Sequence, residues 1–500
     1  MAATLSYTSL EEIDQINAQL RTSFLSGLTK SLEYRKHQLL QFAYLLQDHT
    51  SRFESALAQD LGRPTLEADF LEILPCIGKC LHTYKNVEKW ARPESAPFTL
   101  NFALARPKIL KTPKGVVLII GPFNYPLWSL VGPIASAIAA GNVVVFKPSE
   151  RCPVMASLLT ELIAKYMDPA CIRVVNGSVS ETTRLLECKW DHIFFTGSTS
   201  VGRVVAIAAA KHLTPCTLEV GKSPAFVDPK CNVQLAARKL LWGKIVNAGQ
   251  TCVAPDYVLV PRSFQEPLVS ALKATYRSFY TDDFKTLDDG VYSRLVSPQA
   301  FKRVDGLLKA TKGTIVFGGN TDESRRYIEP TVVKDVMPED SLMKEELFGP
   351  ILPIVPVDDV DAGIRLVNAG DHPLVIYVFS DDSSFKKKVI ENTQSGAIVV
   401  NEVMLHLESG IPFGGIGASG YGRHSFKYGF DEFTHMRGTM DQPAFVDKIL
   451  SIRYPPYTPF KLKAVWAILS TKLPRRPSGP PPTLAKSNSA ATWKRTPLSK

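Results

Sequence analysis

Short apolar runs alternate with segments of helical spacing from about residue 115 to residue 220. Runs this rich in β-branched residues are typical of strands that a parallel sheet buries on both faces. The segments between them have the composition of helices, and residues 9–62 also carry an apolar face with helical spacing. The predicted strands are GVVLIIG (115–121), NVVVF (142–146), IRVV (172–175), HIFF (192–195) and CTLEV (216–220).

This alternation predicts an α/β fold with a doubly wound sheet. A second α/β segment is predicted from about 222 to 415, with helices near 234–248 and 264–279. It closes in the glycine-rich IPFGGIGASGYG (411–422), which is too irregular for a strand or a helix and predicts a binding or hinge loop. Residues 97–113 predict a protruding hairpin between the helical N-terminal part and the sheet.

Polar residues follow several of the predicted strands. Ligands of a doubly wound sheet bind beyond the carboxyl ends of its strands, so these residues are candidates for a binding site. Asn124 follows the first strand, and Lys147 and Glu150 follow the second. The segment GSTSVG (197–202) follows the fourth strand, where backbone amides at a helix start suit a phosphate. Two glycines five residues apart are a weak signal by themselves.

Three residues have side chains suited to covalent catalysis. Cys252, in GQTCVAPDY, follows a predicted helix, and it is either a nucleophile on a loop or one of eight small buried thiols. The Asn124 amide is either a donor to a developing oxyanion or a turn residue before Pro126. Glu219, at an apolar strand end, is either a general base or the salt-bridge partner of Lys222 or of a nearby arginine.

Charge and cysteine usage narrow the class of protein. Eight cysteines in 500 residues lack the spacing of a disulfide framework and indicate reduced thiols in an intracellular compartment. The residues from Ala444 onward include eleven Lys/Arg and one acidic residue, so this segment carries a net charge of +10, which is the net charge of the whole chain. The neutral remainder argues against a nucleic-acid groove. The acidic N-terminus predicts no secretory or mitochondrial leader, and the final PLSK is not a peroxisomal signal.

The basic tail predicts a contact at a membrane surface. Residues 456–476 form a predicted amphipathic helix, whose apolar residues between cationic flanks are too few to span a bilayer but suit the surface of a membrane or of the protein itself. Residues 477–500 are Pro/Ser-rich and basic, and we expect them to be disordered. The expected location is cytoplasmic, or peripheral on a membrane that faces the cytoplasm.

Seven motifs occur in this order along the chain: GPFNYP, FKPSE, FTGSTSVG, LEVGKSP, NAGQTCVAPDY, EELFGP and PFGGIGASGYG. Across residues 10–440 they resemble the motifs of the NAD(P)-dependent aldehyde dehydrogenases, and the sequence GQTCVAPDY is similar to the class 3 branch, which includes the fatty aldehyde dehydrogenases. The resemblance implies a homodimer with a Rossmann-like cofactor-binding domain (1–220, with the hairpin arm 97–113), a catalytic domain (221–415) and a return segment with a dimerisation arm (416–455).

The resemblance also implies a role for each candidate residue. Cys252 would be the nucleophile, with its backbone N–H and Asn124 as the oxyanion hole and Glu219 as the general base. NAD is the expected cofactor because Glu150 would repel a 2′-phosphate, although relatives in this branch also use NADP. In the cofactor site, Lys147 and Glu150 would contact the adenosine ribose, Gly197, Ser198 and Gly202 the pyrophosphate, and Glu346 and Phe348 the nicotinamide side.

The chain departs from the family pattern at one point. The family has two glycines after the base, whereas LEVGKSP has one, so the carboxylate of Glu219 either swings away from Cys252 or stays beside it on a tighter turn. The first hypothesis is therefore an enzyme that oxidises a long-chain or otherwise lipophilic aldehyde. The alternative is a catalytically weakened relative that acts as a membrane-surface or scaffold protein. No metal site is expected: Cys76, Cys80 and the histidines His406 and His424 are interpreted as structural.

Overall fold

The computed structural model of the protein describes residues 5–281 and 285–475, which form two compact units. The larger unit contains the described residues up to Glu94 together with Lys108–Thr439. The smaller unit contains Ser95–Pro107 and the described residues from Met440 onward.

The first sheet of the larger unit has six strands in the order β17-β7-β6-β3-β4-β5. Five of them confirm the predicted parallel strands, and every residue of β3, β4 and β6 is buried. The chain runs outward in one direction from β3 and in the other from β6, so the loops after these two strands diverge and leave a crevice. The bounds are β3 Val116–Ile120, β4 Val143–Lys147, β5 Ile172–Val174, β6 His192–Thr196, β7 Cys216–Glu219 and β17 Gly420–Tyr421.

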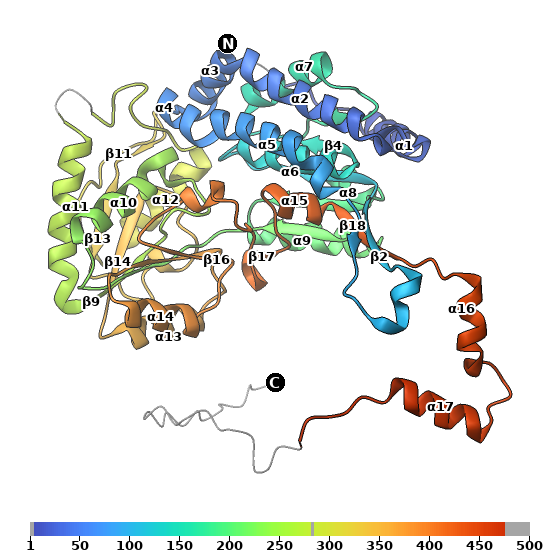
Figure 1. The fold of residues 1–500 in the computed structure, drawn as a ribbon. Coiled ribbons are helices and arrows are strands. Elements are labelled where there is room, and N and C mark those ends of the chain that lie inside the picture. The colour runs from blue at the N-terminus through green and yellow to red at the C-terminus, as the bar shows by residue number, and fades with distance from the viewer. Residues whose placement is uncertain (1–4, 282–284, 476–500) are drawn as a thin grey trace, which may run out of the picture. The chain divides into compact units, whose positions relative to one another are not determined.

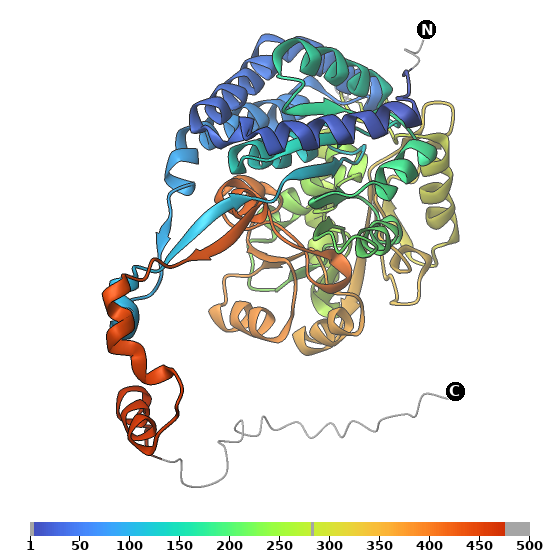
Figure 2. The same cartoon turned by 90° about the vertical axis from the view of Figure 1, so that its right-hand side faces the viewer.

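Helices cover both faces of this sheet (Figure 1). Alternate residues of β3 enter two different cores, with Val117 and Ile119 in one and Val116, Leu118 and Ile120 in the other. The N-terminal helical region continues the two layers, since α2 and α5 pack beside α6 while α1, the dark blue helix across Figure 2, contacts β4 and α8. The helices are α1 Leu10–Ser26, α2 Leu32–Asp48, α3 Thr50–Leu61, α4 Thr65–Ala68, α5 Leu74–Trp90, α6 Trp128–Ala140, α7 Pro153–Tyr166, α8 Val179–Glu187 and α9 Thr199–Ala210.

The second sheet has seven strands in the order β10-β13-β14-β9-β8-β15-β16, all parallel except β10. Helices α10 to α12 and helices α13 and α14 flank it (Figure 1). The strands are β8 Ala225–Val227, β9 Val258–Pro261, β10 Thr314–Phe317, β13 Thr331–Lys334, β14 Ile351–Val357, β15 Val375–Phe379 and β16 Ala397–Val400. The helices are α10 Val233–Ile245, α11 Gln265–Phe279, α12 Pro298–Ala310, α13 Val360–Ala369 and α14 Ser383–Asn392.

Two segments differ from their predicted structure because their partners lie far away in the sequence. The last part of the predicted hairpin 97–113 is the strand β2 (Lys108–Pro113), whose antiparallel partner is β18 (Thr434–Thr439). On its other edge β2 pairs only with the two-residue strand β1 (Glu94–Ser95). Within the predicted hairpin, Leu100–Ala105 is a 3₁₀-helix. The glycine-rich 411–422 is largely irregular as predicted, but its end is β17, which pairs with β7 and returns the chain to the first sheet before α15 (Phe426–Glu432).

The smaller unit contains the helices α16 (Ala444–Ile449) and α17 (Pro459–Leu469). No residue of α17 is buried, and Phe460 and Trp466 are 76% and 67% exposed. Within 5–281 and 285–475, no helix combines the length and the apolar content needed to cross a bilayer. The predicted disordered tail, 477–500, lies outside the described residues.

Candidate active site

A cavity of about 1340 Å³ opens in the larger unit, beyond the carboxyl ends of β3, β4, β6 and β7. Its wall includes nine of the ten residues predicted for the site, drawn from both sheets. These nine are Asn124, Lys147, Glu150, Gly197, Ser198, Glu219, Cys252, Glu346 and Phe348. The tenth, Gly202, lies elsewhere.

Cys252 is half-buried on a loop, as the sequence predicts, but the preceding helix ends earlier than expected. Helix α10 stops at Ile245, and Asn247 and Ala248 then adopt left-handed backbone conformations with φ of 51°. The half-buried Glu67 carboxylate accepts a hydrogen bond from the Asn247 N–H (2.9 Å), which holds this turn in place. The cysteine carbonyl accepts a hydrogen bond from Ser223 (3.0 Å).

The surroundings of Cys252 keep its thiol protonated. Burial raises the pKa of the thiol well above its ordinary value, and the negative charges of Glu219 and Glu346 raise this pKa further. The thiolate is the nucleophilic form. A carboxylate beside the sulfur can act as an acceptor for this proton.

Asn124 lies on the loop after β3, and buried groups hold its backbone. Its carbonyl accepts hydrogen bonds from Nη2 of Arg63 (2.5 Å) and from Nδ2 of Asn247 (2.8 Å). Arg63 pairs with Glu72, and both side chains are fully buried. The other oxygen of Glu72 accepts hydrogen bonds from the N–H groups of Leu127 and Trp128 at 2.8 and 3.0 Å. These N–H groups at the start of α6 have no partner within the helix, so the carboxylate supplies one. These contacts leave the Asn124 carboxamide on the cavity wall.

Glu219, at the end of β7, is 2% exposed and turned toward the cysteine. Its Oε1 lies 3.9 Å from Sγ of Cys252, and its Oε2 accepts a hydrogen bond from Thr196 (3.3 Å). The single-glycine turn is tightened, because Lys222 takes a φ of 114°, a region that favours glycine. Of the two outcomes expected for the shortened turn, the structure has the second, with the carboxylate beside the sulfur.

The sequence predicts only a structural role for His424, and the structure places its side chain against Glu219. Its Nε2 lies 3.0 Å from Oε2 of Glu219, and the side chain is 3% exposed. The sequence signal that could have found it is the glycine-rich segment just before it, which brings the chain back to β7. His406 packs between Tyr377 and Phe413, and burial lowers its pKa to about 4.

The groups predicted to hold the adenosine side lie together at the ends of β4 and β6. Nζ of Lys147 donates to Glu150 (2.9 Å), and this contact lowers the pKa of Glu150 although burial acts to raise it. Ser198 begins α9 and accepts the Val201 N–H (3.4 Å). Gly202 faces Phe195 and Leu218 on the inner side of α9. Gly202 does not line the cavity, and its contact with a pyrophosphate stays a prediction.

The segment predicted for the nicotinamide side precedes β14 of the second sheet and contributes Glu346 and Phe348 to the cavity wall. The Glu346 carboxylate lies against Gly221, where an added Cβ would overlap it. Burial and then Asp256 raise the pKa of Glu346 to about 8. Phe348 contacts Phe123 edge to face, with 5.8 Å between the ring centroids.

Part of the cavity lining is an apolar wall that sequence reasoning missed. One acidic residue interrupts it: Glu408 accepts hydrogen bonds from Trp128 Nε1 (2.8 Å) and from Nζ of the buried Lys79 (2.9 Å). The Lys79 ammonium lies 3.6 Å from the centre of the Trp128 ring. Apolar residues on this wall include Phe70, Leu71, Leu74, Trp128, Met404, Leu405, Leu407 and Phe413.

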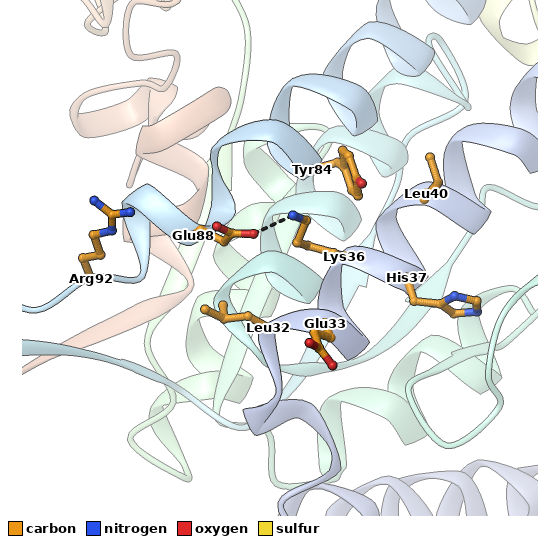
Figure 3. Close-up of a pocket in the computed structure, with 8 residues that line it drawn as sticks. All are labelled: Leu32, Glu33, Lys36, His37, Leu40, Tyr84, Glu88 and Arg92. Carbon is orange, nitrogen blue, oxygen red and sulfur yellow. Dashed lines mark hydrogen bonds and ion pairs between the residues drawn. The ribbon is translucent and has the colours of Figure 1, made fainter.

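A smaller groove of about 580 Å³ lies between α2 and α5 (Figure 3). Lys36 is paired with Glu88 at 2.5 Å, Arg92 lies at the far end, and His37 points away from them. Its charged groups do not converge, so it is not a candidate active site.

Cys76 and Cys80 are fully buried in the core. The described residues contain no group of three or more His, Cys, Asp or Glu placed to hold a metal ion.

The sequence profile of the aldehyde dehydrogenase family matches residues 1–438. The chain belongs to this family and is an NAD(P)-dependent enzyme that oxidises an aldehyde.

Its relatives include members of family 3. It is 41% identical to aldehyde dehydrogenase family 3 member A2 of Mus musculus over 451 residues (90% of this chain and 92% of that one). It is 42% identical to member B1 of Homo sapiens over 447 residues (89% and 95%). These relatives confirm the predicted family and branch.

Solved structures confirm the predicted fold. The substrate-bound state of Staphylococcus aureus AldH has a TM-score of 0.88 and 37% identity, and it covers 92% of this chain and 99% of that one. Mycobacterium tuberculosis aldehyde dehydrogenase complexed with NAD+ has a TM-score of 0.79 and 26% identity, with coverage of 87% and 91%.

Proposed function

We propose that the enzyme oxidises its aldehyde through a covalent bond to Cys252, with Glu219 as the general base and Asn124 as an oxyanion donor. The observation that carries the proposal is the 3.9 Å between Oε1 of Glu219 and Sγ of Cys252 inside one cavity that Asn124 also lines. This arrangement opposes the alternative of a weakened scaffold protein, because such a protein would not need a buried carboxylate held beside a thiol.

In the acylation half, Glu219 takes the thiol proton of Cys252 and the sulfur forms a bond to the carbonyl carbon. The electron pair of the C=O bond moves to oxygen, and the Asn124 amide and the Cys252 N–H stabilise the negative charge. Bound NAD(P)+ supplies the two-electron acceptor for the hydride that leaves this carbon. The oxygen electron pair returns to form the C=O bond of a thioester on Cys252.

In the hydrolytic half, Glu219 takes a proton from water as the water oxygen bonds to the thioester carbon. The C–S bond breaks, its electron pair returns to sulfur, and the carboxylic acid is released. The same carboxylate therefore acts twice, which requires it to lose its first proton to solvent between the two halves.

NAD is the proposed cofactor, and several observations support the fit of a dinucleotide. Lys147 and Glu150 would hold the adenosine ribose, with Gly197 and Ser198 at the pyrophosphate and Glu346 and Phe348 at the nicotinamide side. The cavity is large enough for an extended ligand. At the end of β6 an added Cβ at Gly197 would overlap the Phe195 ring, so the position needs a glycine and carries no side chain. The ionised Glu150 would disfavour the 2′-phosphate of NADP.

A long-chain or lipophilic aldehyde is the proposed substrate, and the apolar wall supports it. Each buried CH₂ contributes about 0.8 kcal/mol, so kcat/KM should rise about fourfold per added carbon from hexanal upward until the wall is filled. NADH formation across linear aldehydes measures this. Leu74→Asn should flatten the trend, whereas Leu66→Asn, on an exposed leucine outside the cavity, should not. Rates that fall with chain length would contradict the proposal.

Peripheral membrane contact through the basic tail is also proposed. Support comes from the exposed aromatic and apolar side chains of α17 beside Lys461 and Lys463. Residues 1–455 alone should fail to sediment with vesicles rich in phosphatidylserine and should oxidise hexanal at nearly the full rate. Vesicle binding that persists without the tail would contradict the assignment.

A homodimer is proposed for the larger unit. Within the described chain β18 is an edge strand, and its residues after Thr434 are exposed. An unpaired strand edge favours association with a second copy. Light scattering of the purified protein tests this proposal, and a monomer at micromolar concentration would contradict it.

A further inference from the structure

The two oxygens of the Glu219 carboxylate have different partners. Oε2 is bound by His424 Nε2 (3.0 Å) and by Thr196 Oγ1 (3.3 Å), whereas Oε1 faces the Cys252 sulfur at 3.9 Å. A carboxylate only accepts hydrogen bonds, so Nε2 of His424 carries the proton when Glu219 is ionised. One oxygen is therefore fixed by donors and the other is left for the reaction.

The position of His424 is itself strongly determined. Backbone hydrogen bonds join His424 and Phe413 in both directions, at 2.7 and 3.0 Å. The imidazole also lies among aromatic rings, with centroids 5.1 Å from Phe194, 5.2 Å from Phe413 and 6.0 Å from Trp128. The ring cannot turn away from Glu219 without displacing these neighbours.

The return of the chain to β7 brings this histidine to the base. Gly420 pairs with Glu219 itself in the antiparallel β17–β7 ladder, and a Cβ at Gly420 would overlap the Leu218 carbonyl. The contact thus joins residues 205 positions apart in the sequence. It also lies next to the turn that is one glycine shorter than in the family pattern, where Lys222 has a φ of 114°.

From this geometry we propose that His424 is a positioning residue for the general base: by holding Oε2, it keeps Oε1 of Glu219 directed at the Cys252 sulfur and at the water that attacks the thioester. The inference rests on the proposed function. Loss of the His424 donor frees the carboxylate to rotate about its last bonds. Because the attacking water is mobile while the sulfur is held by the loop, thioester hydrolysis should suffer more than acylation.

The test compares the NADH burst with the steady-state rate in His424→Phe. The phenyl ring of this variant occupies the space between the aromatic neighbours but has no N–H to donate to Glu219. We expect a burst near one NADH per active site, followed by a steady-state rate about 10- to 100-fold below that of the unaltered enzyme, the usual range for one hydrogen bond to a charged group. His424→Gln keeps an N–H donor and should stay within about threefold. His406→Phe, a buried histidine that does not contact Glu219, is the matched control and should behave like the unaltered enzyme.

Glu219→Gln and the double variant separate the two proposals. If His424 acts through Glu219, adding His424→Phe to Glu219→Gln should slow the enzyme no further. Additive losses, or a steady-state loss below about threefold in His424→Phe, would overturn the positioning role alone. If Glu219→Gln keeps full turnover, the proposed function itself fails.

Discussion

The Cys252→Ala variant is expected to lose at least about 10⁴-fold in kcat/KM for aldehyde oxidation, as nucleophile removal does in covalent enzymes. The sulfur is the atom that bonds to the substrate, and the neighbouring carboxylate cannot replace it. NADH formation with hexanal measures the loss. Cys231→Ala is the matched control, because Cys231 is also half-buried but does not line the cavity. Activity that survives in Cys252→Ala would refute the covalent mechanism.

The reactivity of the same thiol should depend on pH in the protein without cofactor. Only the thiolate reacts with iodoacetamide, and burial together with Glu219 and Glu346 raises the pKa of Cys252. Alkylation should therefore be slow at pH 7 and should speed up about tenfold per pH unit up to pH 9. A rate that levels off at or below pH 9 would show that the pKa is not raised.

The Glu72→Ala variant is expected to lose about 3–5 kcal/mol of unfolding free energy, the usual cost of breaking a buried ion pair. The change leaves the fully buried Arg63 guanidinium without its partner. It also removes the acceptor of the Leu127 and Trp128 N–H groups at the start of α6. Urea unfolding followed by tryptophan fluorescence measures the loss.

Glu161→Ala is the control for this stability change. Glu161 also pairs with an arginine, Arg52, but their side chains are 57% and 43% exposed, and such surface pairs contribute at most about 1 kcal/mol. Since Arg63 also holds the Asn124 carbonyl, Glu72→Ala should lower activity in the protein that remains folded. Equal stability losses in the two variants would contradict the account of the buried pair.

The sequence by itself determined the secondary-structure elements and the candidate residues of the active site. The β-branched runs are buried strands because their pattern depends on neighbouring residues only, and the rule that ligands bind at strand ends then selected Asn124, Lys147, Glu150 and Glu219. The motif resemblance selected Cys252, Glu346 and Phe348, which line the same cavity. These inferences need no knowledge of which distant segments touch.

Only the tertiary structure decided the contacts that hold those residues in place. The sequence did not show that Glu219 remains beside Cys252 on a shortened turn, that His424 binds its second oxygen, or that Arg63 and Glu72 support the Asn124 loop. Each of these depends on packing between segments separated by many residues, and the direction of a side chain in a packed interior is set by all of its neighbours together.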